Sequence, residues 1–157
     1  MAIHPADPDW EDVARAALDQ VLDWASTGTL GTYGELADHV NDDVPDAKLE
    51  PFGFAMGRLL YDLVITVRTF DPQAPMVSSV VVLKDSGEPG GGFWTLGEQL
   101  GLYDRARGVD RSVFWAEQLR ATFDYWTRER RRDLGAWVRR HGMILYGDGR
   151  TTSSRDP

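Results

Sequence analysis

The chain contains no cysteine. This absence excludes disulfide bonds, thiolate zinc sites and a cysteine nucleophile. No apolar run approaches the roughly 18–20 residues of a membrane-spanning helix. The first residues also lack the basic start and apolar core of a signal peptide. We therefore expect a cytoplasmic protein without a membrane partner.

Lysine and histidine are scarce, with two and three copies among 157 residues. The histidines, His4, His39 and His141, lie far apart and lack the spacing of paired metal ligands. The glycine run 90–92 is followed by neither the lysine nor the hydroxyl of a phosphate-binding loop. We therefore expect no metal, no cofactor and no catalytic residues. An enzyme whose site is assembled from separate loops remains an open alternative.

The charge is unevenly distributed, although the net value is −8. Residues 1–50 hold twelve acidic side chains and two basic ones, whereas residues 105–155 hold twelve arginines and six acidic side chains. Such asymmetry can mark a nucleic-acid-binding end. It can equally mark two faces that attract each other within the fold or in a homodimer.

Apolar periodicity predicts three helices in the first half of the chain. The first follows Asp7-Pro8 and ends at Thr27-Gly28, with an apolar face between them. Thr32 and Glu35 have capping-box spacing and open the second helix. The third starts near Pro51, although the β-branched stretch 64–68 allows a strand as an alternative.

The second half predicts a strand, a turn and a return strand over residues 76–94, the last formed by Phe93-Trp94. A short helix capped at Thr95 follows, then a last long helix capped by Asp110 or Ser112, which residues 128–133 interrupt. Residues 143–146 are compatible with a short strand. The predicted class is α+β: one winged-helix-like domain over residues 1–146, extended by C-terminal helices, with a disordered tail over 147–157.

Three motifs between residues 32 and 93 point to a known family. They are Thr32-Tyr33-Gly34-Glu35-Leu36-Ala37, then Phe54-Ala55-Met56-Gly57, and then Ser86-Gly87 with Gly90 to Phe93. This stretch resembles the winged-helix half of the alkylguanine-DNA alkyltransferases and the alkyltransferase-like proteins. The resemblance implies DNA binding, with Tyr33 in the place of a tyrosine that contacts the DNA backbone.

Two departures from the family pattern exclude its chemistry. The reactive Pro-Cys-His-Arg motif of the family falls near residues 78–81, where Ser79 takes the cysteine position and valines replace the histidine and arginine. A serine needs a neighbouring base to become nucleophilic, and none is local. Phe54 replaces the arginine that fills the space of a flipped base. A phenyl ring can still wedge into a base stack, although it is also an ordinary core residue.

The predicted nucleic-acid-binding residues comprise two from the motifs, one arginine on the expected recognition helix and six arginines near the C-terminus: Tyr33, Phe54, Arg58, Arg128, Arg130, Arg131, Arg132, Arg139 and Arg140. The predicted wing carries Lys84, Gly90, Gly91 and Gly92. Arginines neutralise phosphates, and Trp126 and Trp137 could stack on bases. The same arginines could instead form a solvated helix face, paired with Glu129 and Asp133.

Two functions follow from these patterns. The first is a non-enzymatic nucleic-acid-binding protein, with DNA as partner and a regulatory or DNA-damage and defence role. The alternative is a protein interaction module that presents Phe93, Trp94 and the acidic first helix to a protein partner.

Overall fold

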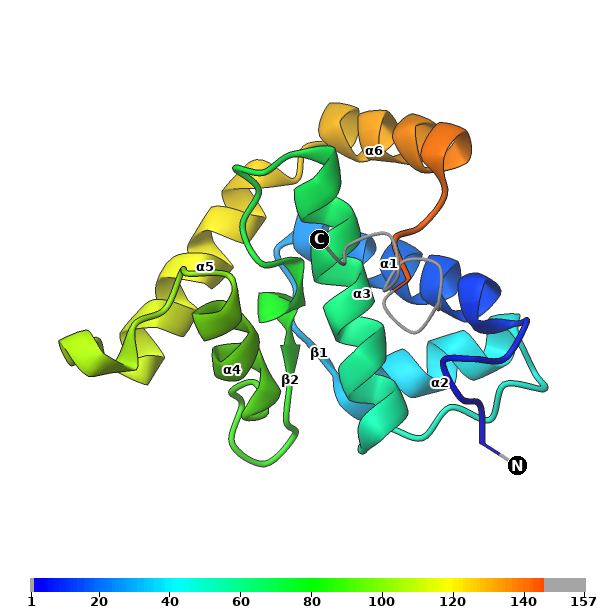
Figure 1. The fold of residues 1–157 in the computed structure, drawn as a ribbon, viewed down its shortest axis with the longest axis horizontal. Coiled ribbons are helices and arrows are strands. Elements are labelled where there is room, and N and C mark those ends of the chain that lie inside the picture. Colours follow the sequence, from blue (N-terminus) through cyan, green and yellow to red (C-terminus); the bar gives the residue numbers. More distant parts are fainter. Residues whose placement is uncertain (1, 146–157) are drawn as a thin grey trace, which may run out of the picture.

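The computed structural model describes residues 2–145 of the 157-residue chain, and it is mostly helical (Figure 1). The α-helices are α1 Trp10–Thr27, α2 Tyr33–Asp43, α3 Phe54–Phe70, α4 Gly92–Gln99, α5 Arg111–Tyr125 and α6 Arg128–His141. Two 3-10 helices, η1 Val77–Val80 and η2 Arg105–Arg107, and two strands, β1 Gly31–Thr32 and β2 Val81–Val82, complete the fold. The α+β class fits this mixture. The expected tail over 147–157 lies outside the described residues.

The core forms where α1 packs against α2, α3 and η1. Apolar side chains recur along one face of α1, as its periodicity predicts, and most of them are buried. At its start, the buried Trp10 donates a hydrogen bond of 2.8 Å from Nε1 to Oδ2 of the buried Asp62 on α3. Gly28 ends the helix in the left-handed conformation, with φ of 72°.

The two strands form a small parallel sheet, in which Gly31 pairs with Val81 and Thr32 with Val82. A parallel pair needs a long connection, and here α2, α3 and η1 supply it. Gly31 is required by close packing, because a Cβ at this position would overlap ring atoms of Trp24.

The predicted starts of α2 and α5 are confirmed. Thr32 and Glu35 form a reciprocal capping box, with hydrogen bonds of 2.9 and 3.1 Å. Asp110 caps α5 by accepting from the N–H groups of Ser112 and Val113. The strand alternative for residues 64–68 is wrong, because α3 continues to Phe70 and buries Val64 and Val67. Burial against α1 outweighs the weak β propensity of this stretch.

The predicted β-hairpin over residues 76–94 does not form. Residues 77–80 are a 3-10 helix, and the two residues of β2 pair with β1 rather than with a return strand. Phe93 and Trp94 lie inside α4 and are buried. The reason is tertiary: the ring of Phe93 packs 5.6 Å from that of Phe114 on α5. In place of a wing, a loop over residues 83–91 runs from β2 to α4.

Three further boundaries differ from the prediction. α4 begins at Gly92, three residues before Thr95, so Thr95 caps nothing. The last helix is split at Trp126 and Thr127, and Thr127 caps α6 through the N–H of Arg130. The arginine-rich residues 128–133 therefore begin a helix instead of interrupting one. Residues 143–145 are not a strand.

α3 runs through the middle of the molecule and connects its two ends (Figure 1). α6 lies across the C-terminal end of α3, where the rings of Phe70 and Trp137 are 6.0 Å apart. The N-terminal end of α3 lies at the other end, near α2 and the loop that precedes α4.

Candidate functional site

A cavity of about 670 Å³ lies beside the N-terminal half of α3, and we call it the α3 cavity. Its walls come from the start of α2, the segment before α3, α3 itself, η1, the 83–91 loop and α4. The lining residues are Tyr33, Pro51, Phe52, Gly53, Met56, Gly57, Arg58, Leu60, Tyr61, Ser78, Leu83, Gly90, Gly92, Phe93, Thr95, Leu96 and Gln99. Its volume falls in the range of small-molecule sites.

The inner wall is apolar apart from one hydroxyl. Buried side chains of Met56, Leu60, Phe93 and Leu96 form most of it. Ser78 also lines the cavity; it is 5% exposed, and its buried Oγ has no hydrogen-bond partner among the described residues. Most buried hydroxyls in folded proteins are hydrogen-bonded. Surrounding atoms cover this Oγ, so the Ser78 side chain would have to turn toward the cavity to meet a ligand there.

The side chain of Tyr33, at the start of α2, reaches the 83–91 loop, which forms another wall of the cavity. Its hydroxyl accepts a 2.8 Å hydrogen bond from the N–H of Gly90 in the 83–91 loop. Burial raises the pKa of Tyr33, although the hydrogen bond from Gly90 acts in the opposite direction. The phenol thus stays protonated at neutral pH, and its O–H can donate to a ligand.

The mouth of the cavity is aromatic and positively charged. Phe52 and Phe54 are each 63% exposed, and the ring of Phe52 lies 6.0 Å from that of Tyr33. The guanidinium carbon of Arg58 lies 5.5 Å from the ring centre of Phe54 and 5.7 Å from that of Tyr61. Within the part of the chain that the structure describes, Arg58 is the one charged side chain in the lining. Phe54 stands beside the mouth, in contact with Arg58.

Two helices begin at the cavity without a side-chain cap. The N-cap residues are Gly53 for α3 and Gly91 for α4, and neither has a side chain that could accept a hydrogen bond. By contrast, Thr32, Asp110 and Thr127 cap α2, α5 and α6. The first N–H groups of an α-helix have no partner inside the helix. At α3 and α4 no N-cap side chain satisfies them.

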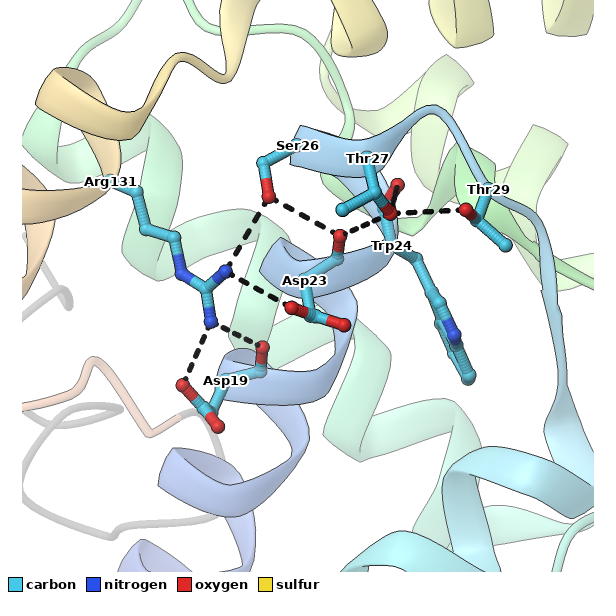
Figure 2. Close-up of polar contacts among 7 residues, drawn as sticks. All are labelled: Asp19, Asp23, Trp24, Ser26, Thr27, Thr29 and Arg131. Carbon is cyan, nitrogen blue, oxygen red and sulfur yellow. Dashed lines mark hydrogen bonds and ion pairs between the residues drawn. The ribbon is translucent and has the colours of Figure 1, made fainter.

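Arg131 is not free to contact a nucleic acid. Its guanidinium reaches across from α6 to α1, with Nη2 3.0 Å from Oδ1 of Asp19 and Nη1 3.4 Å from Oδ1 of Asp23 (Figure 2). It also donates to the carbonyl of Asp19 at 3.2 Å and to Oγ of Ser26 at 3.4 Å. For Arg131, the basic C-terminal segment therefore pairs with the acidic N-terminal segment inside the fold, which is the second of the two interpretations of the charge asymmetry.

The other predicted C-terminal residues divide into two groups. The guanidinium of Arg130 stacks 4.0 Å from the ring centre of Tyr125 and donates to the Tyr125 carbonyl at 3.1 Å. Four more arginines have exposed positions on α6: Arg128, Arg132, Arg139 and Arg140. Trp126 is buried, so it cannot stack on a base.

The structure therefore separates the predicted nucleic-acid-binding residues into two places. Tyr33 and Arg58 line the α3 cavity and Phe54 contacts Arg58, whereas the six arginines lie on α6, at the other end of α3 (Figure 1). A helix of 17 residues is about 25 Å long. Of the predicted wing, Gly90 and Gly92 line the cavity, Gly91 precedes α4 and Lys84 is exposed in the loop.

Sequence reasoning did not single out Ser78, and it named Ser79 only as the residue at the cysteine position of the family. The Oγ of Ser79 donates to Oγ1 of Thr122 on α5 at 3.0 Å, and its carbonyl accepts from Nε1 of Trp115 at 2.8 Å. Ser79 is thus bound to α5, while Ser78 lines the cavity. No sequence signal separates two adjacent serines, because the direction of each depends on how η1 packs.

The interaction surface assigned to Phe93 and Trp94 is wrong, since both side chains are buried.

Among the described residues, no group of three or more His, Asp or Glu side chains could hold a metal ion. No described helix has the length and apolarity needed to cross a membrane. Comparison with protein families, with curated proteins and with solved structures gave no match to this chain.

Proposed function

We propose that this protein binds nucleic acid without catalysis and admits an unpaired base into the α3 cavity. One observation underlies the proposal: exposed Phe52 and Phe54 stand with Arg58 at the mouth of an apolar cavity that contains an unpartnered hydroxyl. The proposal treats α2 and α3 as the DNA-facing helices of a winged-helix-like core, with the 83–91 loop in the place of the wing.

The chemistry of the cavity suits a flat, partly polar ring. Exposed aromatic side chains can wedge between bases and stack on them. The hydroxyl of Tyr33 can donate a hydrogen bond to the edge of a base, and the hydroxyl of Ser78 can do so after its side chain turns toward the cavity. The family resemblance supports this interpretation, because Tyr33 belongs to the Thr32–Ala37 motif and lines the cavity.

The side chains around Ser78 favour binding over chemistry. The described lining contains no histidine, aspartate or glutamate that could accept a proton. A serine hydroxyl is a weak nucleophile unless a neighbouring group takes its proton. We therefore assign Ser78 a role in recognition. A regulatory or DNA-damage role would be consistent with binding of this kind.

The electrostatics lead us to expect an unusual salt dependence. Arg58 is the one cation in the described lining, and the net charge of the chain is −8. The salt dependence of binding to nucleic acid increases with the number of phosphates that the protein neutralises. We therefore expect a shallow slope, close to about one released counterion, and an affinity that depends on the unpaired base.

The test measures fluorescence anisotropy with three labelled oligonucleotides: a single strand, a fully paired duplex and a duplex with one unpaired base. We expect the single strand and the duplex with the unpaired base to bind at least about tenfold more tightly than the paired duplex, since stacking contributes about 1–3 kcal/mol per base. Phe54→Ala should remove most of this preference.

Val113→Ala is the matched control, because Val113 is a similarly exposed apolar residue on α5, whereas Phe54 contacts the lining residue Arg58. Absence of binding at low salt would overturn the proposal. Binding with a steep salt dependence that is lost on Arg139→Ala/Arg140→Ala would instead place the nucleic acid on α6.

A second candidate function is binding of a protein partner. The exposure of Phe52 and Phe54 on an acidic protein favours it, since aromatic side chains are enriched at the centres of protein interfaces. A second copy of the chain would be the simplest such partner. Sedimentation analysis of the wild type and of Phe52→Ala/Phe54→Ala tests it: a dimer that the double substitution dissociates would support this candidate.

A further inference from the structure

We infer that Gln99, the last residue of α4, recognises the hydrogen-bonding edge of the base that enters the α3 cavity. The inference deepens the proposed function and rests on it for the nature of the ligand. It gives a specificity-determining role to the side-chain amide of Gln99, which presents a carbonyl acceptor and an N–H donor side by side. The ligand class is a heterocyclic base whose edge carries a donor beside an acceptor.

The first observation is the position of Gln99 on α4. Phe93, Thr95, Leu96 and Gln99 all line the cavity from this helix. Phe93 and Leu96 are buried, whereas Thr95 and Gln99 are exposed, and their spacing of four residues places them on one face of the helix. The wall that α4 contributes therefore has an apolar inner part and a polar outer part. A ligand that contacts both parts needs an apolar face and a hydrogen-bonding edge.

The second observation is that the Gln99 amide has no hydrogen-bond partner among the described residues. Two other carboxamides of this chain are bonded to backbone groups. Oε1 of Gln118 accepts a hydrogen bond of 2.9 Å from the N–H of Met76. Asn41 donates from Nδ2 to the carbonyl of Leu49 at 3.0 Å and accepts from the N–H of Leu49 at 2.7 Å. In contrast to these two, Gln99 keeps its donor and its acceptor available to a ligand.

The pair formed by Asn41 and Leu49 shows how such an amide recognises its target. Asn41 contacts an N–H donor and a carbonyl acceptor of one residue with both of its polar atoms. The edge of adenine presents a similar pattern, an amino group beside a ring nitrogen, and Asn and Gln side chains bind it through two hydrogen bonds. Gln99 can therefore accept from the amino group and donate to the ring nitrogen.

The third observation is the scarcity of other acceptors in the cavity. Within the described lining, Gln99 is the one side chain with a carbonyl or carboxylate oxygen. Arg58 has donors only, and the hydroxyl of Tyr33 already accepts the hydrogen bond from Gly90. An amino group on a base is a donor and requires an acceptor. The Gln99 carbonyl, with two lone pairs, matches this requirement.

Titration calorimetry with three nucleosides tests this role directly. The nucleosides are adenosine, guanosine and purine riboside, which has the ring system of adenosine without the amino group. We expect the wild type to bind adenosine at least about tenfold more tightly than purine riboside, since a two-bond contact to a base edge discriminates by at least several-fold. Gln99→Met, which keeps the length of the side chain and removes the amide, should bring the two affinities to about the same value.

Gln99→Glu should change the order of the affinities. Glutamate has the size of glutamine, but its ionised carboxylate has acceptors only. Guanine presents two adjacent N–H groups, at N1 and at the 2-amino group, which match a carboxylate. We therefore expect Gln99→Glu to bind guanosine about tenfold more tightly than adenosine. A side chain that only shaped the wall would leave the order of the wild type unchanged.

Gln73→Glu is the matched control, because Gln73 is also exposed and lies outside the described lining. It should leave all three affinities at the wild-type values. Neither Gln99→Met nor Gln99→Glu should lower the urea midpoint of unfolding, because the exposed amide of Gln99 has no partner to lose within the described chain.

The outcomes separate this inference from the proposed function. Equal wild-type affinities for adenosine and purine riboside, or no affinity for any nucleoside, overturn the role of Gln99, whereas a preference for the duplex with an unpaired base would still support the proposed function. An order of affinities that Gln99→Glu leaves unchanged also overturns the inference. Nucleoside recognition that depends on Gln99, without binding of any oligonucleotide, supports the inference and overturns the proposed binding of a strand.

Discussion

The α6 arginines and the mouth of the α3 cavity are two cationic regions of this molecule, and they differ in what surrounds the charge. On α6, Arg131 is held by Asp19 and Asp23, and Arg130 lies on Tyr125. At the cavity, one arginine stands with exposed aromatic rings, an uncapped helix start and an unpartnered hydroxyl.

The difference shows that the number of charges is a poor guide to a binding site. An arginine that already has carboxylate partners on its own chain, such as Arg131, must lose them before it can bind a phosphate. A buried hydroxyl and a helix start without a cap have more to gain from a ligand, because no partner has to be displaced. Four experiments test this comparison, and they are ordered by the size of the expected effect.

The largest effect is expected when the cavity is blocked. Gly57 lines the cavity, has an ordinary helical conformation and has open space where a Cβ would lie, so Gly57→Leu should cover the opening without strain in the backbone. We expect ligand affinity to fall at least about tenfold, or about 1.4 kcal/mol, as measured by calorimetry. Gly135→Leu on α6 is the matched control, and an equal loss there would contradict the site.

The second effect concerns the link between α6 and α1. Arg131→Ala removes contacts to Asp19, Asp23 and Ser26, and we expect urea denaturation to show a loss of about 1 kcal/mol, since the pair is partly exposed. Arg132→Ala, at an exposed position beside it, should change stability by less than about 0.5 kcal/mol. Equal effects of the two substitutions would show that Arg131 has no special structural role.

The third effect compares the two serines. Ser79→Ala removes a buried hydrogen bond to Thr122 and should cost about 1 kcal/mol of stability with ligand affinity unchanged. Ser78→Ala should leave the stability unchanged and weaken ligand affinity. A thermal scan measures the stability of both variants, and a titration measures their ligand affinity. A loss of ligand affinity in Ser79→Ala would contradict the separate roles of the two serines.

The smallest effect lies where the end of α5 meets the end of α3, and it depends on pH. A hydrogen bond from the Tyr125 hydroxyl, 2.7 Å from Oδ2, lowers the pKa of Asp71 below its ordinary 3.8. A carboxyl whose pKa is lowered by folding adds stability above its unfolded pKa, and this stability is lost as the pH falls through the folded pKa.

Tyr125→Phe should therefore lose about 0.5 kcal/mol near neutral pH, because solvent screens this contact, and the loss should disappear in strongly acidic solution. Urea titrations at several pH values measure it. Tyr103→Phe is the matched control, because the hydroxyl of Tyr103 donates to the carbonyl of Val109, which does not titrate. A loss of the same size at every pH in Tyr125→Phe would show that the tyrosine acts through packing alone.

Local sequence features predicted much of the helical structure. The apolar face of α1, the Thr32–Glu35 capping box and the Asp110 cap all lie within a few residues of the bonds they form. The predicted hairpin was wrong, because the pairing of Val81 and Val82 with β1 and the packing of Phe93 against α5 involve distant residues. Tyr33 was proposed as a site residue from a motif and Arg58 from its place on the expected recognition helix, but nothing local indicated the cavity that both line.

The sequence alone thus determined the starts of α2 and α5 and the apolar face of α1, because caps and apolar periodicity act over one or two turns. Only the tertiary structure decided which of the two serines lines the cavity and which arginine forms ion pairs with α1. It also decided that the uncapped start of α3 lies beside the cavity. Each of these depends on contacts between residues far apart in the chain. Burial and satisfaction of polar groups are properties of the packed molecule, and no local pattern encodes them.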